Sequence, residues 1–153
     1  VILGVSDSTW ASDVDDRRSV SGRMIYVNNC LVAWGSRKQR HNALSSTEAE
    51  YYALSECIAD VMQVKQLLES IGRTVKLPIE VQCDNQGAIF LTANEATSRT
   101  RHIDNRYHFI RQYMKDGIIN VTYVNTKENK ADHQTKNLPR DELIKVRVSY
   151  LNG

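Results

Sequence analysis

The sequence has little of what secreted and membrane-bound proteins require. Its three cysteines are odd in number, far apart and each placed in an apolar segment: Cys30, Cys57 and Cys83. This pattern argues against a disulfide framework or a zinc site, so we expect buried thiols in a reducing compartment. No apolar run approaches the roughly 20 residues that a membrane span needs. Residues 1–5 also lack the basic start of a signal peptide.

The chain also lacks a large excess of charge of either sign. Its net charge of +2 is too small to indicate a nucleic-acid partner by itself, so the clustering of basic residues must decide that question. With 153 residues, 41% of them apolar, and no repeat or low-complexity tract, we expect a single domain over residues 1–153. Because the sequence enters an apolar run without a Met, we expect this domain to be excised from a longer polypeptide.

Hydrophobic periodicity predicts that the chain opens with three antiparallel strands. Residues 1–5 are a β-branched apolar run. Two further apolar runs, 24–27 and 31–34, lie on either side of an Asn pair, which is typical of a hairpin.

A long helix is expected next, because Ser45 to Glu48 has the form of a capping box and an apolar stripe then runs to Gly72. The remaining elements are expected to be a strand at 79–83, a short helix at 88–91, a helix at 101–115, a strand at 118–124 and a helix from Ala131 onward. A strand–helix–strand crossover makes part of the sheet parallel. The sequence thus predicts an α/β fold with a mixed five-stranded sheet flanked by helices.

Glu50 is the most informative carboxylate of the chain. Leu54, Cys57 and Ile58 lie four, seven and eight residues after it, which places Glu50 on the apolar stripe of the long helix. A carboxylate on that stripe indicates a function. The simpler explanation, a position at the exposed rim of the first turn that complements the helix dipole, stays equally open.

Three aspartates lie where other elements begin or end. Asp84 follows a strand and precedes a helix, the position of ligand sites in open α/β sheets, although helix capping would also explain it. Asp7 interrupts the first strand, where a turn is the alternative. Asp132 is expected in the first turn of the last helix, where the helix dipole would suffice.

Taken together, the four carboxylates predict a metal site. Such a cluster would repel itself unless cations neutralised it, and Mg²⁺ or Mn²⁺ prefers oxygen ligands. Two ions about 3.5 to 4 Å apart stabilise both the attacking and the leaving oxygen of a phosphoryl displacement.

Several sequence blocks closely resemble the ribonuclease H domain of copia-type LTR-retrotransposon Pol polyproteins. In chain order they are SD and W within 6–10, DVDDRRSVSG at 13–22, WGSRKQ at 34–39, ALSSTEAEY at 43–51, CDNQ at 83–86, RHID with RYHFIR within 101–111, and AD at 131–132. The resemblance implies a ribonuclease H-like fold that follows a reverse transcriptase and degrades the RNA strand of RNA–DNA hybrids.

The resemblance also assigns roles to individual residues. Asp7 would bridge two Mg²⁺ ions, for which Mn²⁺ could substitute. Glu50 and Asp84 would complete the shell of one ion, and Asp132 would help to hold the other. Gln86 resembles the position that contacts the minor groove of the hybrid near the 2′-hydroxyls. The implied partners are an RNA–DNA hybrid and the reverse transcriptase of the same polyprotein, and the implied location is cytoplasmic, in retrotransposon particles.

This chain departs from the family pattern at a few positions. Thr9 and Ser12 replace an Asp and a Gly of the first motif, and His133 with Gln134 replaces an aliphatic pair. Residues 125–129 lack the His that cellular ribonucleases H carry in the loop before the last Asp. The polar pair is expected to loosen the last helix and to misplace Asp132, whereas the missing His is expected to slow turnover and to leave the metal site in place.

Two clusters of basic residues are the candidate phosphate contacts. One contains Arg37 and Lys38, and the other contains Arg101 and Arg106; a solvated helix face is the alternative for the second. The aromatic residues are assigned to packing: Trp10, Trp34, Tyr107, Phe109 and Tyr113.

Two functions from different classes remain open on the sequence. The first is a hybrid-specific endonuclease. The alternative is a catalytically weak ribonuclease H-like module that binds the hybrid or braces a reverse transcriptase. A different nuclease or an integrase on the same fold is disfavoured, because those proteins usually use three carboxylates at other spacings.

Overall fold

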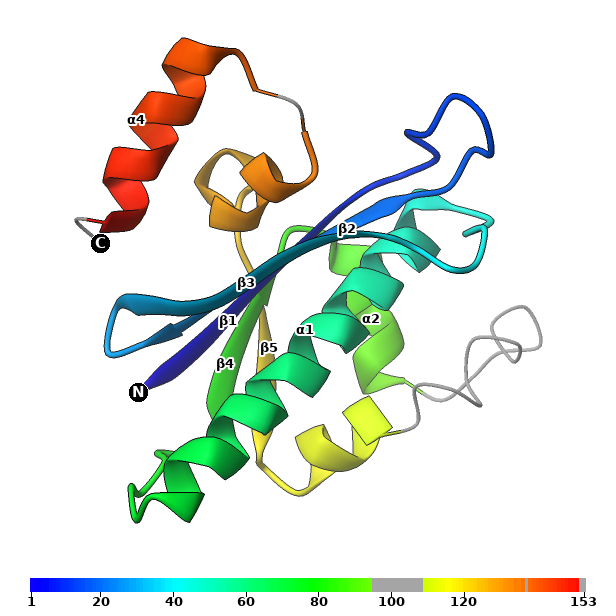
Figure 1. Cartoon of the computed structure of the whole chain (residues 1–153). Helices are drawn as coiled ribbons and strands as arrows, with labels where there is room; N and C mark the ends of the chain where they lie inside the picture. The colour runs from blue at the N-terminus through cyan, green and yellow to red at the C-terminus, as the bar shows by residue number, and fades with distance from the viewer. Residues whose placement is uncertain (95–108, 137, 152–153) are drawn as a thin grey trace.

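A computed structural model describes residues 1–94, 109–136 and 138–151 of the chain. Its centre is a five-stranded sheet with the strand order β3-β2-β1-β4-β5 (Figure 1). The strands are β1 (Ile2–Thr9), β2 (Val20–Val27), β3 (Cys30–Lys38), β4 (Ile79–Cys83) and β5 (Ile119–Tyr123). The first three strands are antiparallel to one another, whereas β4 is parallel to both of its neighbours. The mixed sheet predicted from the sequence is confirmed.

The hairpin between β2 and β3 turns at Asn28 and Asn29. Their φ angles are 49° and 65°, and Val27 pairs directly with Cys30. Two central residues with positive φ define a type I′ turn, which Asn tolerates better than most residues. The turn fixes the register of β2 and β3.

The long helix α1 (Ser46–Ser70) begins where the capping motif predicted. The hydroxyl of Ser45 accepts a hydrogen bond of 3.1 Å from the backbone N–H of Glu48. The carboxylate of Glu48 accepts a hydrogen bond from the N–H of Leu44, one residue before the cap, at 3.2 Å. The cap fixes the start of α1 and so the place of Glu50, a little over one turn further on.

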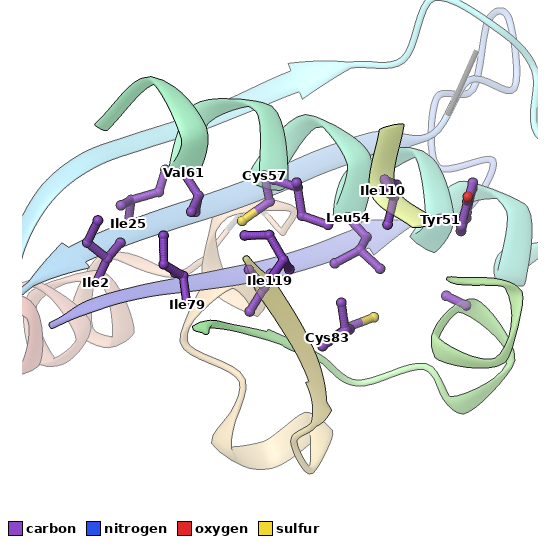
Figure 2. Packing of buried hydrophobic residues seen from close by; sticks show 14 residues of the cluster. Ile2, Ile25, Tyr51, Leu54, Cys57, Val61, Ile79, Cys83, Ile110 and Ile119 are labelled. Carbon is purple, nitrogen blue, oxygen red and sulfur yellow. The ribbon is translucent and has the colours of Figure 1, made fainter. Parts of the chain in front are cut away.

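The main core lies between α1 and one face of the sheet (Figure 2). Ile25 of β2, Val81 of β4 and Ile119 of β5 pack beneath Leu54 and its apolar neighbours on α1. The helix α2 (Gln86–Ala93) and the helical residues 109–115 complete this layer, to which they contribute the buried side chains of Ala88 and Ile110. Phe109 and Tyr113 are partly buried against the same core, in agreement with their assignment to packing.

The opposite face of the sheet carries the segment after β5 (Figure 1). Two short 3₁₀ helices, η1 (Thr126–Glu128) and η2 (Lys130–Gln134), precede the last helix α4 (Arg140–Leu151). The expectation of a continuous helix from Ala131 is therefore wrong, and Asp132 lies in a 3₁₀ turn. Pro139 explains the break, because it disfavours a helical conformation at Leu138 and is itself well suited to open a new helix.

Three further expectations about burial are wrong. Trp10 is 48% exposed and Trp34 is 65% exposed, so neither is a core residue. Cys30 is exposed, unlike the buried Cys57 and Cys83. Cys30 and Trp34 lie on the edge strand β3, where few neighbours cover alternate side chains, and Trp10 lies in the loop after β1. None of the helices in the described ranges has the length and apolar character that crossing a membrane would demand.

Candidate metal centre

Asp7 and Asp84 lie at the carboxyl ends of two adjacent parallel strands. The register pairs Val5 of β1 with Gln82 of β4, so each aspartate lies two residues beyond that pair. Asp7 is 3% exposed. The side chain of Asn85, not that of Asp84, caps α2 by accepting from the N–H of Ala88 at 2.9 Å. Capping of α2 therefore does not explain the carboxylate of Asp84.

Glu50 points from α1 towards the end of β1. Its side chain is buried, and its Oε1 accepts a hydrogen bond of 3.1 Å from the backbone N–H of Ser8. Its Oε2 is also buried but has no hydrogen-bond partner within the described residues. A buried carboxylate oxygen without a donor is costly, and a position at the exposed rim of the helix is ruled out. The geometry favours a cation or a proton on this oxygen.

Asp132 joins the cluster from η2 on the other face of the sheet. The ammonium of Lys136 donates to Oδ1 of Asp132 at 2.5 Å. The hydroxyl of Thr135 lies 2.6 Å from Oδ2 of Asp7 and donates to it. The segment that carries the fourth carboxylate is thus tied directly to the first one.

Two residues that the sequence reasoning missed hold η2 against the sheet. Asn129 is buried; its Nδ2 donates to the carbonyl of Ser6 at 2.9 Å, and its Oδ1 accepts from the N–H of Ala131 at 3.0 Å. Gly22 pairs with Asp7 across β1 and β2. A Cβ atom at Gly22 would lie 2.8 Å from the Cβ of Gln134, so the approach of η2 requires a glycine there.

The polar pair His133 and Gln134 does not prevent this docking, because Gln134 packs its Cβ against Gly22. Nδ1 of His133 is buried without a hydrogen-bond partner in the part of the chain that the structure describes. A glycine within a strand is the sequence signal that could have indicated the close approach at Gly22.

The pKa values of the cluster reflect burial and mutual repulsion. Burial is the main cause that raises the pKa of Glu50 to about 8, and the charges of Asp7 and Asp84 raise it further. Burial also raises the pKa of Asp7 to about 6, against the hydrogen bond from Thr135 and with repulsion from Asp84 and Asp132. Repulsion from Asp84 thus acts on both buried carboxylates, and repulsion from Asp132 acts on Asp7.

The donor set suits a hard divalent cation. Ligand atoms of Glu50, Cys83 and Asp84 all lie within 4.8 Å of one another. Burial raises the pKa of the Cys83 thiol to about 12, so Cys83 stays protonated and the carboxylate oxygens remain as the donors. Oxygen ligands and an orphaned buried oxygen at Glu50 fit Mg²⁺ or Mn²⁺ better than zinc.

The predicted nucleic-acid contacts do not all lie beside the carboxylates. Gln86 is exposed at the first position of α2, two residues after Asp84. Arg37 and Lys38 end the edge strand β3, two strands away from β1. Lys38 forms ion pairs with Asp13 at 2.6 Å and Asp16 at 3.1 Å, so its charge is already matched.

Arg101 and Arg106, as well as Tyr107, lie outside the described residues. Of the helix predicted at 101–115, the described part, residues 109–115, is helical. The second basic cluster therefore stays a prediction from the sequence.

Comparison with solved structures identifies the class of fold. LC11-RNase H1, solved in complex with an RNA/DNA hybrid, superposes with a TM-score of 0.64, covering 94% of this chain and 99% of that chain at 13% identity. At that identity the likeness concerns the fold alone. The chain has a ribonuclease H-like fold.

Comparison with curated proteins then identifies the family. The retrovirus-related Pol polyprotein from transposon TNT 1-94 of Nicotiana tabacum is 38% identical over 144 residues, which cover 94% of this chain and 11% of that protein. The corresponding polyprotein from transposon RE2 of Arabidopsis thaliana is 38% identical over 136 residues, which cover 88% of this chain and 9% of that protein. No family model matches the chain.

The chain is homologous to a segment of the retrovirus-related Pol polyproteins of copia-type transposons, and it has a ribonuclease H-like fold. It spans about a tenth of the length of the polyproteins that it matches. The resemblance indicated by the sequence blocks is confirmed.

Proposed function

We propose that this domain hydrolyses the RNA strand of RNA–DNA hybrids by two-metal-ion catalysis during reverse transcription. The observation that carries the proposal is the cluster of Asp7, Glu50, Asp84 and Asp132, in which Asp7 and Glu50 are buried and Oε2 of Glu50 has no donor among the described residues. A site built of oxygen ligands with unneutralised charge suits Mg²⁺ and a phosphodiester substrate. The solved neighbour that binds an RNA/DNA hybrid supports this substrate class.

Asp7, Glu50, Asp84 and Asp132 would together hold the two ions. Bound Mg²⁺ supplies an activated water and neutralises charge on the leaving oxygen. The protein contributes the positions of the ligands: the N–H of Ser8 orients Glu50, and Asn129 keeps η2 next to β1.

Residues beside the metal ligands would contact the substrate. Gln86 is exposed next to Asp84, which suits a contact with the minor groove of the hybrid, where the 2′-hydroxyls distinguish RNA from DNA. The partners proposed for the whole polyprotein are the hybrid and its own reverse transcriptase, within cytoplasmic retrotransposon particles.

The proposal is tested by cleavage of a labelled RNA–DNA hybrid with Mg²⁺ or Mn²⁺. We expect Asp84→Asn to lower the rate by about 100-fold or more, on the order of the loss when an electrostatic group of an active site is removed. The fold should be retained, because the Asp84 side chain is only partly buried and does not cap α2.

The matched control is Asp116→Asn, which makes the same chemical change near the start of β5, at the opposite end of the parallel strands. We expect this variant to cleave like the wild type. Equal metal-dependent rates for wild type and Asp84→Asn, both folded by circular dichroism, would refute the nuclease function.

One observation favours the second candidate, a module that binds the hybrid without efficient cleavage. The Asp132 carboxylate is already engaged by Lys136, which would hinder the second ion. A gel shift of the hybrid without cleavage in either metal would support the binding module.

A further inference from the structure

Thr135 and Lys136 are consecutive residues that donate hydrogen bonds to carboxylates of the candidate metal centre. Thr135 donates to Oδ2 of Asp7 at 2.6 Å, and Lys136 donates to Oδ1 of Asp132 at 2.5 Å. Neither of them is among the proposed metal ligands or substrate contacts. The two accepting oxygens belong to Asp7 and Asp132, which are both proposed metal ligands.

The contact of Lys136 differs from an ordinary surface ion pair. An exposed pair spaced four residues apart on a helix contributes only about 0.3–0.5 kcal/mol, since water screens both charges. Here the Asp132 side chain is 20% exposed. The ammonium also interacts electrostatically with Asp7 and Asp84, so it lies in the field of three carboxylates.

A cation at this place and a metal ion compete for the same oxygen. Lys136 neutralises part of the charge that would attract Mg²⁺, and an ammonium that donates to Oδ1 of Asp132 blocks metal coordination there. The lysine stem is flexible and its side chain is 51% exposed, so the ammonium can leave towards solvent without moving the backbone.

We propose that Lys136 is an internal counter-ion that occupies Asp132 in the metal-free protein and is displaced when a divalent cation binds. This inference rests on the proposed metal site. The hydroxyl of Thr135 has the same role at Asp7: it is a neutral donor to Oδ2, which the incoming ion replaces. The protein thereby avoids an uncompensated cluster of charge at low metal concentration, and its affinity for metal is lower than the ligand set alone would give.

The test measures metal binding, without a substrate. Calorimetric titration of Mn²⁺ into the protein should give a dissociation constant about tenfold lower for Lys136→Met than for the wild type, or roughly 1.4 kcal/mol in binding free energy. Lys136→Gln should behave in the same way. Lys136→Arg should stay close to the wild type, because a guanidinium can replace the ammonium at Asp132.

The matched control is Lys127→Met in η1, which removes one positive charge from the same segment. Within the described ranges Lys127 forms no ion pair with any of the four carboxylates, so its effect on the dissociation constant should be under twofold. Circular dichroism in EDTA provides a second readout: we expect Lys136→Met to melt at a lower temperature than Lys127→Met, because it alone loses the counter-ion.

The outcomes separate this inference from the proposed function. If the wild type binds Mn²⁺ but Lys136→Met and Lys136→Gln bind it no more tightly than Lys127→Met, the counter-ion role is wrong and the metal site stands. Weaker binding by these variants would also overturn the inference, because Lys136 would then support the site. If neither the wild type nor the variants bind Mn²⁺, the metal site itself fails.

Discussion

The carboxylate of Glu50 is held where its ionised form is poorly stabilised. One oxygen accepts a backbone hydrogen bond from Ser8, and the other is buried without a donor among the described residues. Burial and the charges of Asp7 and Asp84 raise its pKa to about 8. At neutral pH and without metal, this residue therefore destabilises the fold whenever it loses its proton.

We therefore expect Glu50→Gln to stabilise the metal-free protein at about pH 8 by about 1–3 kcal/mol, since a pKa shift of one unit corresponds to about 1.4 kcal/mol. The glutamine keeps an acceptor for the N–H of Ser8 and removes the buried charge. Urea unfolding in EDTA measures the effect.

The control for this prediction is Glu69→Gln, near the end of α1, where the carboxylate is exposed and pairs with Lys65. Its effect should lie within about 0.5 kcal/mol. A Glu50→Gln variant that is less stable than the wild type in EDTA would contradict the assigned cost of the buried charge.

At the scale of single residues, the sequence indicated the positions of the carboxylates better than those of the residues that surround them. Helical spacing placed Glu50 on the apolar stripe, and the strand end indicated Asp84. Asn129 and Thr135 gave no such signal, because their partners, Ser6 and Asp7, lie 123 and 128 residues away in the sequence. Contacts between distant segments depend on the tertiary fold, which residue spacing does not encode.

The element η2 depends on a close approach to β2. A Cβ atom at Gly22 would meet the Cβ of Gln134 and the Cγ2 of Thr135 at 2.8 Å each, and the carbonyl of Ala131 at 3.0 Å. The Cβ of Gln134 and the carbonyl of Ala131 are held in place by the backbone of the docked turn, so they cannot move away without moving η2. Any side chain at Gly22 must push η2 off the sheet.

We expect Gly22→Ala to destabilise the protein by about 1–3 kcal/mol, the usual cost of overpacking a well-packed site. Hybrid cleavage should fall by about 100-fold, because a displacement near 1 Å can cost that much at an active site. Thermal unfolding and the cleavage assay provide the two readouts.

Gly35→Ala is the matched control in the neighbouring strand β3. Its new Cβ would meet the guanidinium of Arg23 at 3.0 Å, which is the flexible end of a side chain and can shift. This variant should keep cleavage activity within about twofold. Equal losses for both glycine variants would indicate a general effect on the sheet and not a displacement of η2.

Among the elements, those with local signals were predicted well. The Asn pair indicated the β2–β3 turn, and the Ser45 cap indicated the start of α1. The segment from Ala131 was predicted as one helix but is a 3₁₀ turn followed by α4. The local residue pattern of this segment is compatible with a helix, and the two helical parts, η2 and α4, are separated only by the break before Pro139.

On the scale of the whole molecule, we expect the proposed site to make the stability of the fold depend on both pH and metal. The folded pKa values of Asp7 and Glu50, about 6 and about 8, lie above their ordinary values of 3.8 and 4.5. A group with a raised folded pKa stabilises the fold fully below its ordinary pKa, and this contribution is lost as the pH rises through the folded value. The metal-free protein should therefore lose stability between about pH 4 and about pH 8 on account of this pair.

Metal ions should reverse this loss, because they bind the deprotonated carboxylates. We expect the difference in melting temperature between saturating Mg²⁺ and EDTA to grow from about pH 5 to about pH 8 and then to level off. Scanning fluorimetry across this range measures it. In Glu50→Gln the growth should be smaller and largely confined to pH values near 6. A difference that is independent of pH would contradict the raised pKa values.

The hydrogen bonds from Asn129 to Ser6 and from Thr135 to Asp7 join the two ends of the domain. During synthesis, the sheet strand that carries Asp7 leaves the ribosome long before the turn that carries Asp132. An unfinished domain can therefore hold three of the four carboxylates but lacks the last one and its anchors. A hydrolytic activity that needs all four would therefore begin only after the segment that carries Asp132 has been made and has docked on the sheet.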